Sequence, residues 1–265
     1  MLLASVKRVI HQRPLGLVFD IDGTLSPIAP TPELARLHPA VPSLLEQANH
    51  HAGVHVAILT GRAVDDGAAM VNVPGLTYVG THGLEWSDGL PSESSVRMEA
   101  EALAYARPGK QLLDLAERHL ASFPGFLVER KRIGGAIHYR LCPDPEQARL
   151  RILALLREPA RERNMVLSEG KRVVEIKAPL RINKGKALRT FAERFALRGV
   201  LFAGDDRTDL DAVKEIAALR DEGVSGLSVV VKHADTLPEL LERADVVVEE
   251  VEGMAELLRE IVERL

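Results

Sequence analysis

Short runs of apolar residues, each ending at polar residues or glycine, recur in both halves of the chain. Unbroken apolar runs of this kind are typical of strands buried on both faces of a parallel sheet. The segments between them place apolar residues at helical spacing, so strands and helices alternate. The predicted strands cover residues 15–19, 54–59, 77–79, 200–203, 228–231 and 245–248. The predicted helices cover residues 40–52, 184–195, 210–219, 237–243 and 254–265.

The pattern changes in the middle of the chain. The predicted order there is a helix at 110–122, strands at 126–131 and 136–141, a helix at 144–158, and strands at 165–168 and 172–176. Two helices and two hairpins of this kind predict an antiparallel sheet with helices on one face. The fold class is therefore α/β, with a parallel-sheet core of residues 1–107 and 181–265. An α+β domain of residues 108–180 is inserted into that core.

Composition limits the classes of partner. The chain has 34 basic and 38 acidic residues, which gives a net charge of −4, and its residues are 46% hydrophobic. This balance lacks the broad positive field that favours nucleic acids or anionic membranes, so neither is expected as a partner. No apolar run approaches the length of a membrane span, and the basic N-terminal stretch lacks the pattern of a secretion signal.

Cysteine usage is consistent with a reducing compartment. The only cysteine, Cys142, forms neither an internal disulfide nor a cysteine-rich zinc site. We therefore expect a soluble cytoplasmic protein. The sequence leaves the oligomeric state open, with a monomer as the default expectation.

The first predicted strand ends in Asp20-Ile-Asp22-Gly23-Thr24. Open α/β sheets bind ligands at the carboxyl ends of their strands, and a glycine turn allows two nearby carboxylates to point into one crevice. The alternative is a calcium loop of the EF-hand type. Such a loop needs a Glu at its twelfth position, which the sequence from Asp20 onward does not supply.

Two further segments offer groups that bind phosphate. Thr60-Gly61-Arg62 follows the second strand and supplies a hydroxyl and backbone N–H groups. Lys184 begins the helix that follows the inserted domain, where it can reach carboxylates or a phosphate. Taken alone, Thr60-Gly61-Arg62 is also typical of an ordinary turn, and Lys184 is also typical of a solvated lysine.

A second acidic cluster follows the strand at 200–203. Asp205, Asp206 and Asp209 lie within five positions, and carboxylates this close repel one another unless a cation joins them. Together with Asp20 and Asp22 they predict a Mg²⁺ site, with Asp20, Asp22, Asp205 and Asp206 as its ligands. The sequence leaves open whether Asp206 or Asp209 joins Asp205 at the metal.

The order of these four motifs resembles the haloacid dehalogenase (HAD) superfamily of phosphohydrolases. The resemblance implies a Rossmannoid core with an inserted cap of the C2 type, built of two α-β-β units. It also implies that Asp20 is the nucleophile and that Asp22 is the general acid and then the base. Thr60 would bind phosphate and Lys184 would steady the phosphoaspartate, so these four residues form the expected catalytic set.

The same resemblance implies how the site holds its metal and which reaction it catalyses. Asp20, Asp205 and the backbone carbonyl of Asp22 would hold Mg²⁺. Asp22 must carry a proton to act as an acid, and crowding by neighbouring carboxylates would favour that form. Thr24 is the residue that phosphatases of the superfamily carry, which disfavours a dehalogenase.

Segments of the inserted domain narrow the resemblance to the trehalose-6-phosphate phosphatases. They are residues 128–131, 137–140 and 174–176, together with core residues 80–85, and the likeness extends from residue 18 to the last helix. It implies that Glu129, Lys131 and Glu175 bind sugar hydroxyls of a small-molecule sugar phosphate. Gly61, Arg62, His82 and Arg140 complete the expected substrate-binding set. The plainer alternatives are an exposed ion pair for Glu129 and Lys131, and a structural histidine for His82.

The resemblance leaves other activities open. The same chemistry can act on sucrose phosphate, a mannosyl phosphate or a hexose phosphate, and a phosphomutase would pass the phosphoryl group to a second hydroxyl. A sugar-phosphate sensor without turnover is disfavoured, because it has no need of a nucleophile beside an acid. The leading expectation is a Mg²⁺-dependent phosphatase that acts on trehalose 6-phosphate in trehalose biosynthesis.

Overall fold

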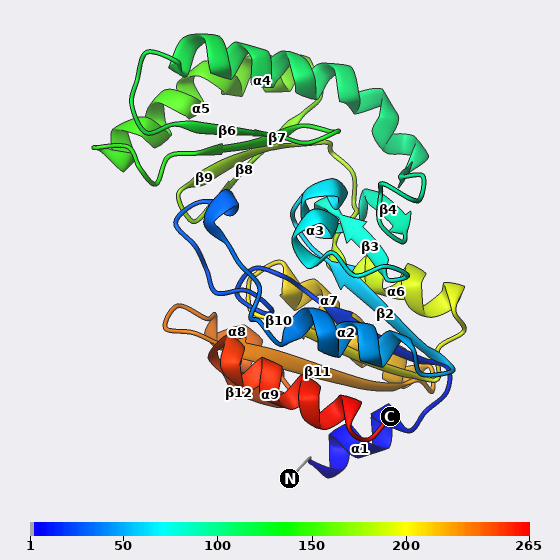
Figure 1. The fold of residues 1–265 in the computed structure, drawn as a ribbon. Coiled ribbons are helices and arrows are strands. Elements are labelled where there is room, and N and C mark those ends of the chain that lie inside the picture. Colours follow the sequence, from blue (N-terminus) through cyan, green and yellow to red (C-terminus); the bar gives the residue numbers. More distant parts are fainter. Residues whose placement is uncertain (1–2) are drawn as a thin grey trace. The chain divides into compact units, whose positions relative to one another are not determined.

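The chain folds into two compact units. The computed structural model describes residues 3–265, so the first two residues of the predicted core lie outside the described part. One unit combines Met1–Arg97 with Ile182–Leu265, and the other covers Met98–Arg181 (Figure 1). The predicted inserted domain, residues 108–180, falls within the second unit. Each unit has its own hydrophobic core.

The first unit is built on an eight-stranded sheet with β1 (Leu15–Phe19) near its centre. The strand order is β12-β11-β10-β1-β2-β3-β4-β5. The pairs from β12 to β3 are parallel, whereas β3 and β4 are antiparallel. All five residues of β1 are buried, as the unbroken apolar run predicts. The other strands are β2 (Val54–Leu59), β3 (Thr77–Gly80), β4 (Glu85–Asp88), β5 (Arg97–Met98), β10 (Gly199–Gly204), β11 (Ser225–Lys232) and β12 (Val246–Glu249).

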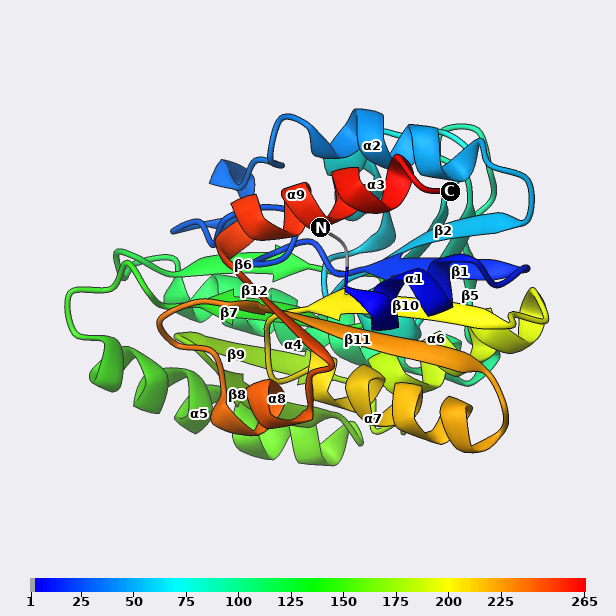
Figure 2. The same cartoon turned by 90° about the horizontal axis from the view of Figure 1, so that it is seen from below.

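Helices cover both faces of this sheet (Figure 2). Leu17 and Phe19 of β1 pack into one core and Val18 packs into the other, because successive side chains of a strand point to opposite faces. One face is covered by α1 (Ala4–Ile10), α2 (Val41–Asn49), α3 (Val64–Val71) and α9 (Glu250–Val262). The other is covered by α6 (Lys184–Arg194), α7 (Asp209–Asp221) and α8 (Pro238–Arg243).

A buried carboxylate fixes the segment between β3 and β4. Glu85 accepts hydrogen bonds from the backbone N–H of Val64, at 2.9 Å, and from the Thr81 hydroxyl, at 3.1 Å. It therefore ties the start of α3 to the short 3-10 helix Thr81–Gly83. Anionic side chains are stabilising at a helix N-terminus, which accounts for a fully buried Glu at this position.

The second unit is an antiparallel sheet with both of its long helices on one face, as the sequence predicts. Its strand order is β6-β7-β9-β8. The turn between β6 and β7 requires glycine, because Gly134 has φ +69° and a Cβ there would lie 1.9 Å from the carbonyl oxygen of Ile176. The elements are the 3-10 helix Ala100–Tyr105, α4 (Ala106–Leu120), β6 (Leu127–Arg130), β7 (Gly135–His138), α5 (Pro145–Glu162), β8 (Val166–Gly170) and β9 (Val173–Lys177).

Among the helices of residues 3–265, none is long and apolar enough to cross a membrane.

Candidate active site

The sheet of the first unit brings three of the predicted motifs to one edge. Asp20 follows β1 directly, and its backbone N–H donates to the carbonyl of Ala203 in β10, at 2.9 Å. β10 and β2 run parallel to β1 on either side of it, so Asp205 and Thr60 emerge at the same carboxyl edge. Asp20, Thr60 and Asp205 are all buried.

Lys184 joins two carboxylates at this edge. It is the first residue of α6, whose start is capped by the Asn183 side chain, which accepts from the N–H of Lys186 at 2.9 Å. The Lys184 ammonium lies 2.8 Å from Asp20 Oδ1 and 2.7 Å from Asp209 Oδ1, and its side chain is only 2% exposed. Burial lowers the pKa of Lys184, but the two carboxylates outweigh it and raise that pKa above its ordinary value. Lys184 is therefore charged at every physiological pH.

Gly23 allows Asp205 to approach the first loop closely. It has φ +84°, and a Cβ at this position would lie 2.1 Å from Asp205 Oδ2. The Thr24 hydroxyl donates to Asp205 Oδ1 at 3.4 Å. Gly23 therefore leaves room for the Asp205 carboxylate, and Thr24 donates a hydrogen bond to it.

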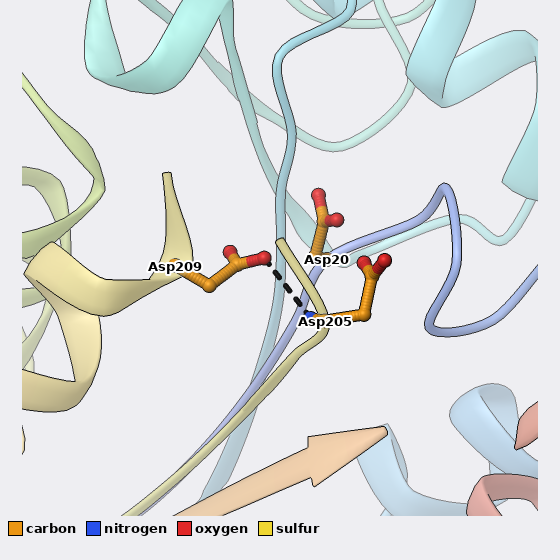
Figure 3. A group of neighbouring side chains, drawn as sticks. All are labelled: Asp20, Asp205 and Asp209. Atoms are coloured by element: carbon orange, nitrogen blue, oxygen red, sulfur yellow. Dashed lines mark hydrogen bonds between the residues drawn. The ribbon is translucent and has the colours of Figure 1, made fainter. Parts of the chain in front are cut away.

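Asp209, rather than Asp206, shares the buried cluster with Asp20 and Asp205 (Figure 3). Within residues 3–265, these three carboxylates form the group whose oxygens lie within 4.8 Å of one another. Asp209 Oδ2 accepts from the backbone N–H of Asp205 at 3.1 Å and of Asp206 at 2.9 Å, while Oδ1 accepts from Lys184. Asp206 itself is exposed. Asp209 therefore holds the loop and the lysine, and leaves Asp20 and Asp205 to face a cation.

The charges of this cluster suit a hard cation. Burial raises the pKa of Asp20 to about 7, with the ammonium of Lys184 acting in the opposite direction. Burial, and then the charges of Asp20 and Asp209, raise the pKa of Asp205 to about 9. Three crowded carboxylates thus face a single ammonium. Mg²⁺ prefers one or two carboxylate oxygens in such a setting, so Asp20 and Asp205 fit it.

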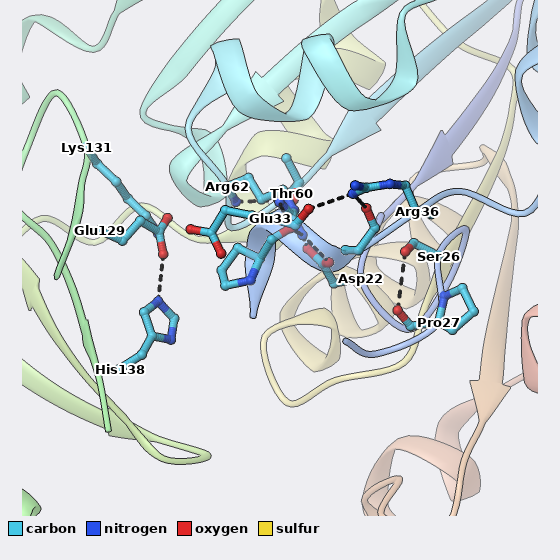
Figure 4. Close-up of polar contacts among 12 residues, drawn as sticks. Asp22, Ser26, Pro27, Glu33, Arg36, Thr60, Arg62, Glu129, Lys131 and His138 are labelled. Atoms are coloured by element: carbon cyan, nitrogen blue, oxygen red, sulfur yellow. Dashed lines mark hydrogen bonds and ion pairs between the residues drawn. The ribbon is translucent and has the colours of Figure 1, made fainter. Parts of the chain in front are cut away.

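Asp22 is paired with Arg62 rather than crowded by acids (Figure 4). Arg62 donates from Nε to Asp22 Oδ2 at 2.7 Å and from a terminal nitrogen to Oδ1 at 2.6 Å. Both terminal nitrogens of Arg62 also lie 3.2 Å from the Pro32 carbonyl. The expected crowding of Asp22 by Asp20 and Asp205 is not the dominant contact, because a bidentate arginine occupies both carboxylate oxygens.

The second motif folds around Thr60. The backbone N–H of Arg62 donates to the Thr60 hydroxyl at 3.2 Å, and the backbone N–H of His82 donates to the Thr60 carbonyl at 3.0 Å. A Cβ at Gly61 would lie 2.7 Å from the His82 ring, so glycine is what allows the imidazole to approach. The structure thus brings Thr60, Gly61 and His82 together.

In the second unit, two predicted residues lie on one face of the sheet. Glu129 in β6 and Glu175 in β9 are both paired in register with Ala136 of β7, so their side chains share a face. Ile137 and Val174, at alternate positions, belong to the core beneath the helices. Glu129 and Glu175 therefore face away from the helices.

Charged partners surround both glutamates on this face. Glu129 lies 2.8 Å from His138 Nε2 and 3.6 Å from Lys131 Nζ (Figure 4), and Glu175 lies 2.5 Å from Lys177 Nζ. The Lys131 side chain is 8% exposed, which does not match the alternative of a solvated pair. We call Glu129, Lys131, His138, Glu175 and Lys177 the polar face.

Part of this surface differs from the predicted site. β7 ends at His138, short of the strand predicted to residue 141, so Arg140 lies in the following turn and is exposed. His138 and Lys177 are absent from the predicted site. Side chains two positions apart in a strand share a face, so His138 lies on the face of Ala136 and Lys177 on the face of Glu175. This period would have predicted both residues as part of the surface.

Comparison with known proteins decides the family. A family described as trehalose-phosphatase matches residues 18–244. The chain belongs to the trehalose-phosphatase family. It is 33% identical over 235 residues to the trehalose-phosphate phosphatase of Mycobacterium leprae and 32% identical over 232 residues to that of Mycobacterium tuberculosis. These alignments cover 84% of this chain but 52% and 55% of the relatives, so the chain spans about half the length of the curated relatives it matches.

Several solved structures share the fold. A trehalose-6-phosphate phosphatase related protein has a TM-score of 0.76 at 23% identity, covering 93% of this chain and 97% of that one. The C-terminal domain of the Candida albicans trehalose-6-phosphate phosphatase has a TM-score of 0.78 at 19% identity, covering 98% and 97%. A haloacid dehalogenase-like hydrolase from Bacteroides thetaiotaomicron has a TM-score of 0.65 at 14% identity, covering 93% and 98%. The predicted HAD-like fold with a parallel-sheet core is confirmed.

Proposed function

We propose that this protein is a Mg²⁺-dependent phosphatase that hydrolyses trehalose 6-phosphate to trehalose and phosphate. The observation that carries the proposal is the buried contact of Asp20 with Lys184, at 2.8 Å, beside the carboxylate of Asp205. A carboxylate can attack a phosphate ester only where its own charge and that of the phosphoryl group are offset. Membership of the trehalose-phosphatase family supports this choice of substrate.

The reaction has two steps at phosphorus. In the first, an oxygen of Asp20 forms a bond to phosphorus while the bond from phosphorus to the sugar oxygen breaks, and Asp22 gives that oxygen a proton. In the second, water attacks the phosphorus of the aspartyl-phosphate, Asp22 takes a proton from it, and the bond to Asp20 breaks. Atoms and protons balance, because Asp22 ends the cycle protonated as it began.

The chain's own groups supply part of the charge compensation. The ammonium of Lys184 faces Asp20, and the Thr60 hydroxyl would donate to a phosphate oxygen. Asp20, Asp205 and the backbone carbonyl of Asp22 would hold Mg²⁺. When bound, the ion neutralises charge on the transferring phosphoryl group. Asp209 keeps Lys184 and the loop of Asp205 in place through the three hydrogen bonds described above.

The pairing of Asp22 with Arg62 must open during this cycle. Both oxygens of Asp22 are directed at the guanidinium, so the carboxyl group has to turn away from Arg62 before it can deliver a proton to the leaving oxygen. A phosphate dianion is a stronger partner for a planar guanidinium than one carboxylate is. We therefore assign Arg62 to phosphate binding, with release of Asp22 as the consequence.

The polar face of the second unit is proposed to bind the sugar. Trehalose is an array of hydroxyl groups, each of which both donates and accepts hydrogen bonds. Glu129 and Glu175 offer acceptors, while Lys131 offers donors. Sites that hydrogen-bond a substrate hydroxyl discriminate strongly against analogues that lack it. Specificity would therefore depend on these residues, and reaction rate on the first unit.

Phosphate release from trehalose 6-phosphate, measured with Mg²⁺ and with EDTA, tests the proposal. We expect Mg²⁺-dependent release that is lost in Asp20→Asn and kept in Asp221→Asn, an exposed acid at the end of α7. Sucrose 6-phosphate, mannosyl phosphate and glucose 6-phosphate should give lower kcat/KM values. Equal rates on all four esters would contradict the substrate, and release that survives EDTA would contradict the metal.

A further inference from the structure

His233 connects two loops at the carboxyl edge of the parallel sheet. The last register pair of β11 and β12 is Lys232 with Glu249, so the next residues, His233 and Glu250, emerge side by side. His233 Nδ1 lies 2.6 Å from Glu250 Oε2, and Nε2 lies 2.5 Å from the backbone carbonyl oxygen of Gly23. The imidazole therefore reaches past β10 to the loop that follows β1.

The two contacts define which groups donate. A carbonyl oxygen only accepts, so Nε2 must donate to Gly23. Nδ1 forms the second contact, with the Glu250 carboxyl group, so each ring nitrogen has a hydrogen-bond partner. The His233 side chain is 12% exposed, and its backbone N–H donates to the Thr236 hydroxyl at 2.8 Å. The imidazole is thus fixed at both ring nitrogens and at its backbone.

Glu250 has an unfavourable backbone conformation. Its φ is +54°, in the left-handed region that non-glycine residues seldom occupy. Its side chain is 60% exposed, so burial does not explain this conformation. Such conformations persist where surrounding contacts require them, and the contact made here is the one with His233.

The bond to Gly23 restrains the most flexible point of the first motif. Glycine has more backbone freedom than any other residue, and Gly23 sits between Asp22 and Thr24. Its N–H donates to the Ser26 carbonyl at 2.7 Å, which fixes the peptide plane that also contains the Asp22 carbonyl. Its own carbonyl is fixed by His233. Both peptide planes that flank Gly23 are therefore held.

We propose that His233, held by Glu250, is a positioning residue for the Mg²⁺ site. By fixing the carbonyl of Gly23 it keeps the Asp22 carbonyl and the Asp205 carboxylate, which packs against Gly23, in a geometry that suits the ion. Groups that orient metal ligands contribute about 10- to 100-fold to metal affinity. This inference deepens the proposed function and rests on it for the identity of the ion.

Calorimetric titration of the metal-free protein with Mg²⁺ tests the proposal directly. We expect His233→Ala to weaken Mg²⁺ binding about tenfold. His233→Gln should recover most of that loss, because its side-chain amide can still donate to Gly23. The matched control is Glu249→Gln, which removes the neighbouring exposed ion pair with Lys232 and should bind Mg²⁺ like the wild type. In turnover, His233→Ala should need more Mg²⁺ for half-maximal rate, with an unchanged KM for the sugar phosphate.

Several outcomes would overturn the proposal. One is a folded His233→Ala protein with wild-type Mg²⁺ affinity, and another is His233→Gln being as weak as His233→Ala. If His233→Ala does not fold, Glu250→Ala can replace it, because it changes only an exposed side chain. This variant should weaken Mg²⁺ binding about threefold. An unchanged Mg²⁺ affinity in Glu250→Ala would also overturn the proposal. A wild-type protein that binds Mg²⁺ without hydrolysing any ester would contradict the proposed function alone, because the calorimetric comparison would still hold.

Discussion

Arg62 binds both carboxylate oxygens of Asp22, at 2.7 Å and 2.6 Å. The Arg62 side chain is 12% exposed, and the Pro32 carbonyl accepts further hydrogen bonds from it. Partly buried bidentate pairs of this kind are specific and strong. The candidate acid is therefore held by the residue that the proposed mechanism assigns to the phosphate, and substrate binding and proton donation become coupled.

Arg62→Ala should lower kcat/KM for trehalose 6-phosphate about 10- to 100-fold, because a charged hydrogen bond to the phosphate is lost. Arg62→Lys should recover little of this, since an ammonium lacks the planar fork. Steady-state kinetics measure both values, and Arg198→Ala, an exposed arginine of the same unit, is the control. Wild-type kinetics in Arg62→Ala would exclude the proposed exchange of partners.

Lys184→Met should destabilise the metal-free protein by about 3 kcal/mol, because removing one partner leaves buried charges unpaired. The exposed neighbour Lys186→Met should change stability little. Urea unfolding in EDTA compares the two. Added Mg²⁺ should restore part of the stability of Lys184→Met, but not its activity. Equal unfolding midpoints for Lys184→Met and Lys186→Met would contradict the account of the buried cluster.

Magnesium should stabilise the protein more strongly at alkaline pH. In the metal-free fold the pKa of Asp20 is raised to about 7 and that of Asp205 to about 9, from an ordinary value of 3.8. The fold therefore holds protons that the unfolded chain has lost. The stability that these groups contribute is fully present below about pH 3.8 and is lost as pH rises through 7 toward 9.

Mg²⁺ replaces those protons, so adding Mg²⁺ should raise Tm more at about pH 8.5 than at about pH 5.5. Thermal unfolding across that range, with and without the ion, measures the effect, and calorimetry in buffers of different ionisation enthalpy should detect proton release. A Tm shift that does not depend on pH would argue against protonated carboxylates in the metal-free cluster.

Glu129→Ala and Glu175→Ala should reduce kcat/KM for trehalose 6-phosphate about tenfold or more, because each removes hydrogen bonds to sugar hydroxyls. Hydrolysis of p-nitrophenyl phosphate, which has no sugar, should change little in either variant. Glu158→Ala, an exposed acid of α5, serves as the control. A parallel loss on both esters would indicate that these residues support folding rather than sugar recognition.

The α/β fold with its parallel-sheet core could be predicted from the sequence because its signals are local. Apolar runs such as β1 and the glycine turn at Gly134 have few structural alternatives. The close approach of Asp20, Lys184 and Asp205 followed once the strands were placed, since parallel strands end at one edge.

Other features could not be predicted because they depend on side-chain contacts between segments far apart in the chain. No local sequence pattern indicates that Asp22 pairs with Arg62 or that His233 contacts Gly23. The sequence alone does not show which of Asp206 and Asp209 is the buried carboxylate. Only the turn before α7 determines that Asp209 points inward to accept from the backbone and that Asp206 is exposed.

Detection of an aspartyl-phosphate at Asp20 would show that this carboxylate attacks the phosphorus. The protein would be mixed with trehalose 6-phosphate and Mg²⁺, quenched in acid within one turnover, reduced with borohydride and analysed by peptide mass spectrometry. We expect reduction of the Asp20 side chain to an alcohol, only when both substrate and Mg²⁺ are present. Reduction at a different carboxylate, or rapid phosphate release with residue 20 always intact, would contradict it.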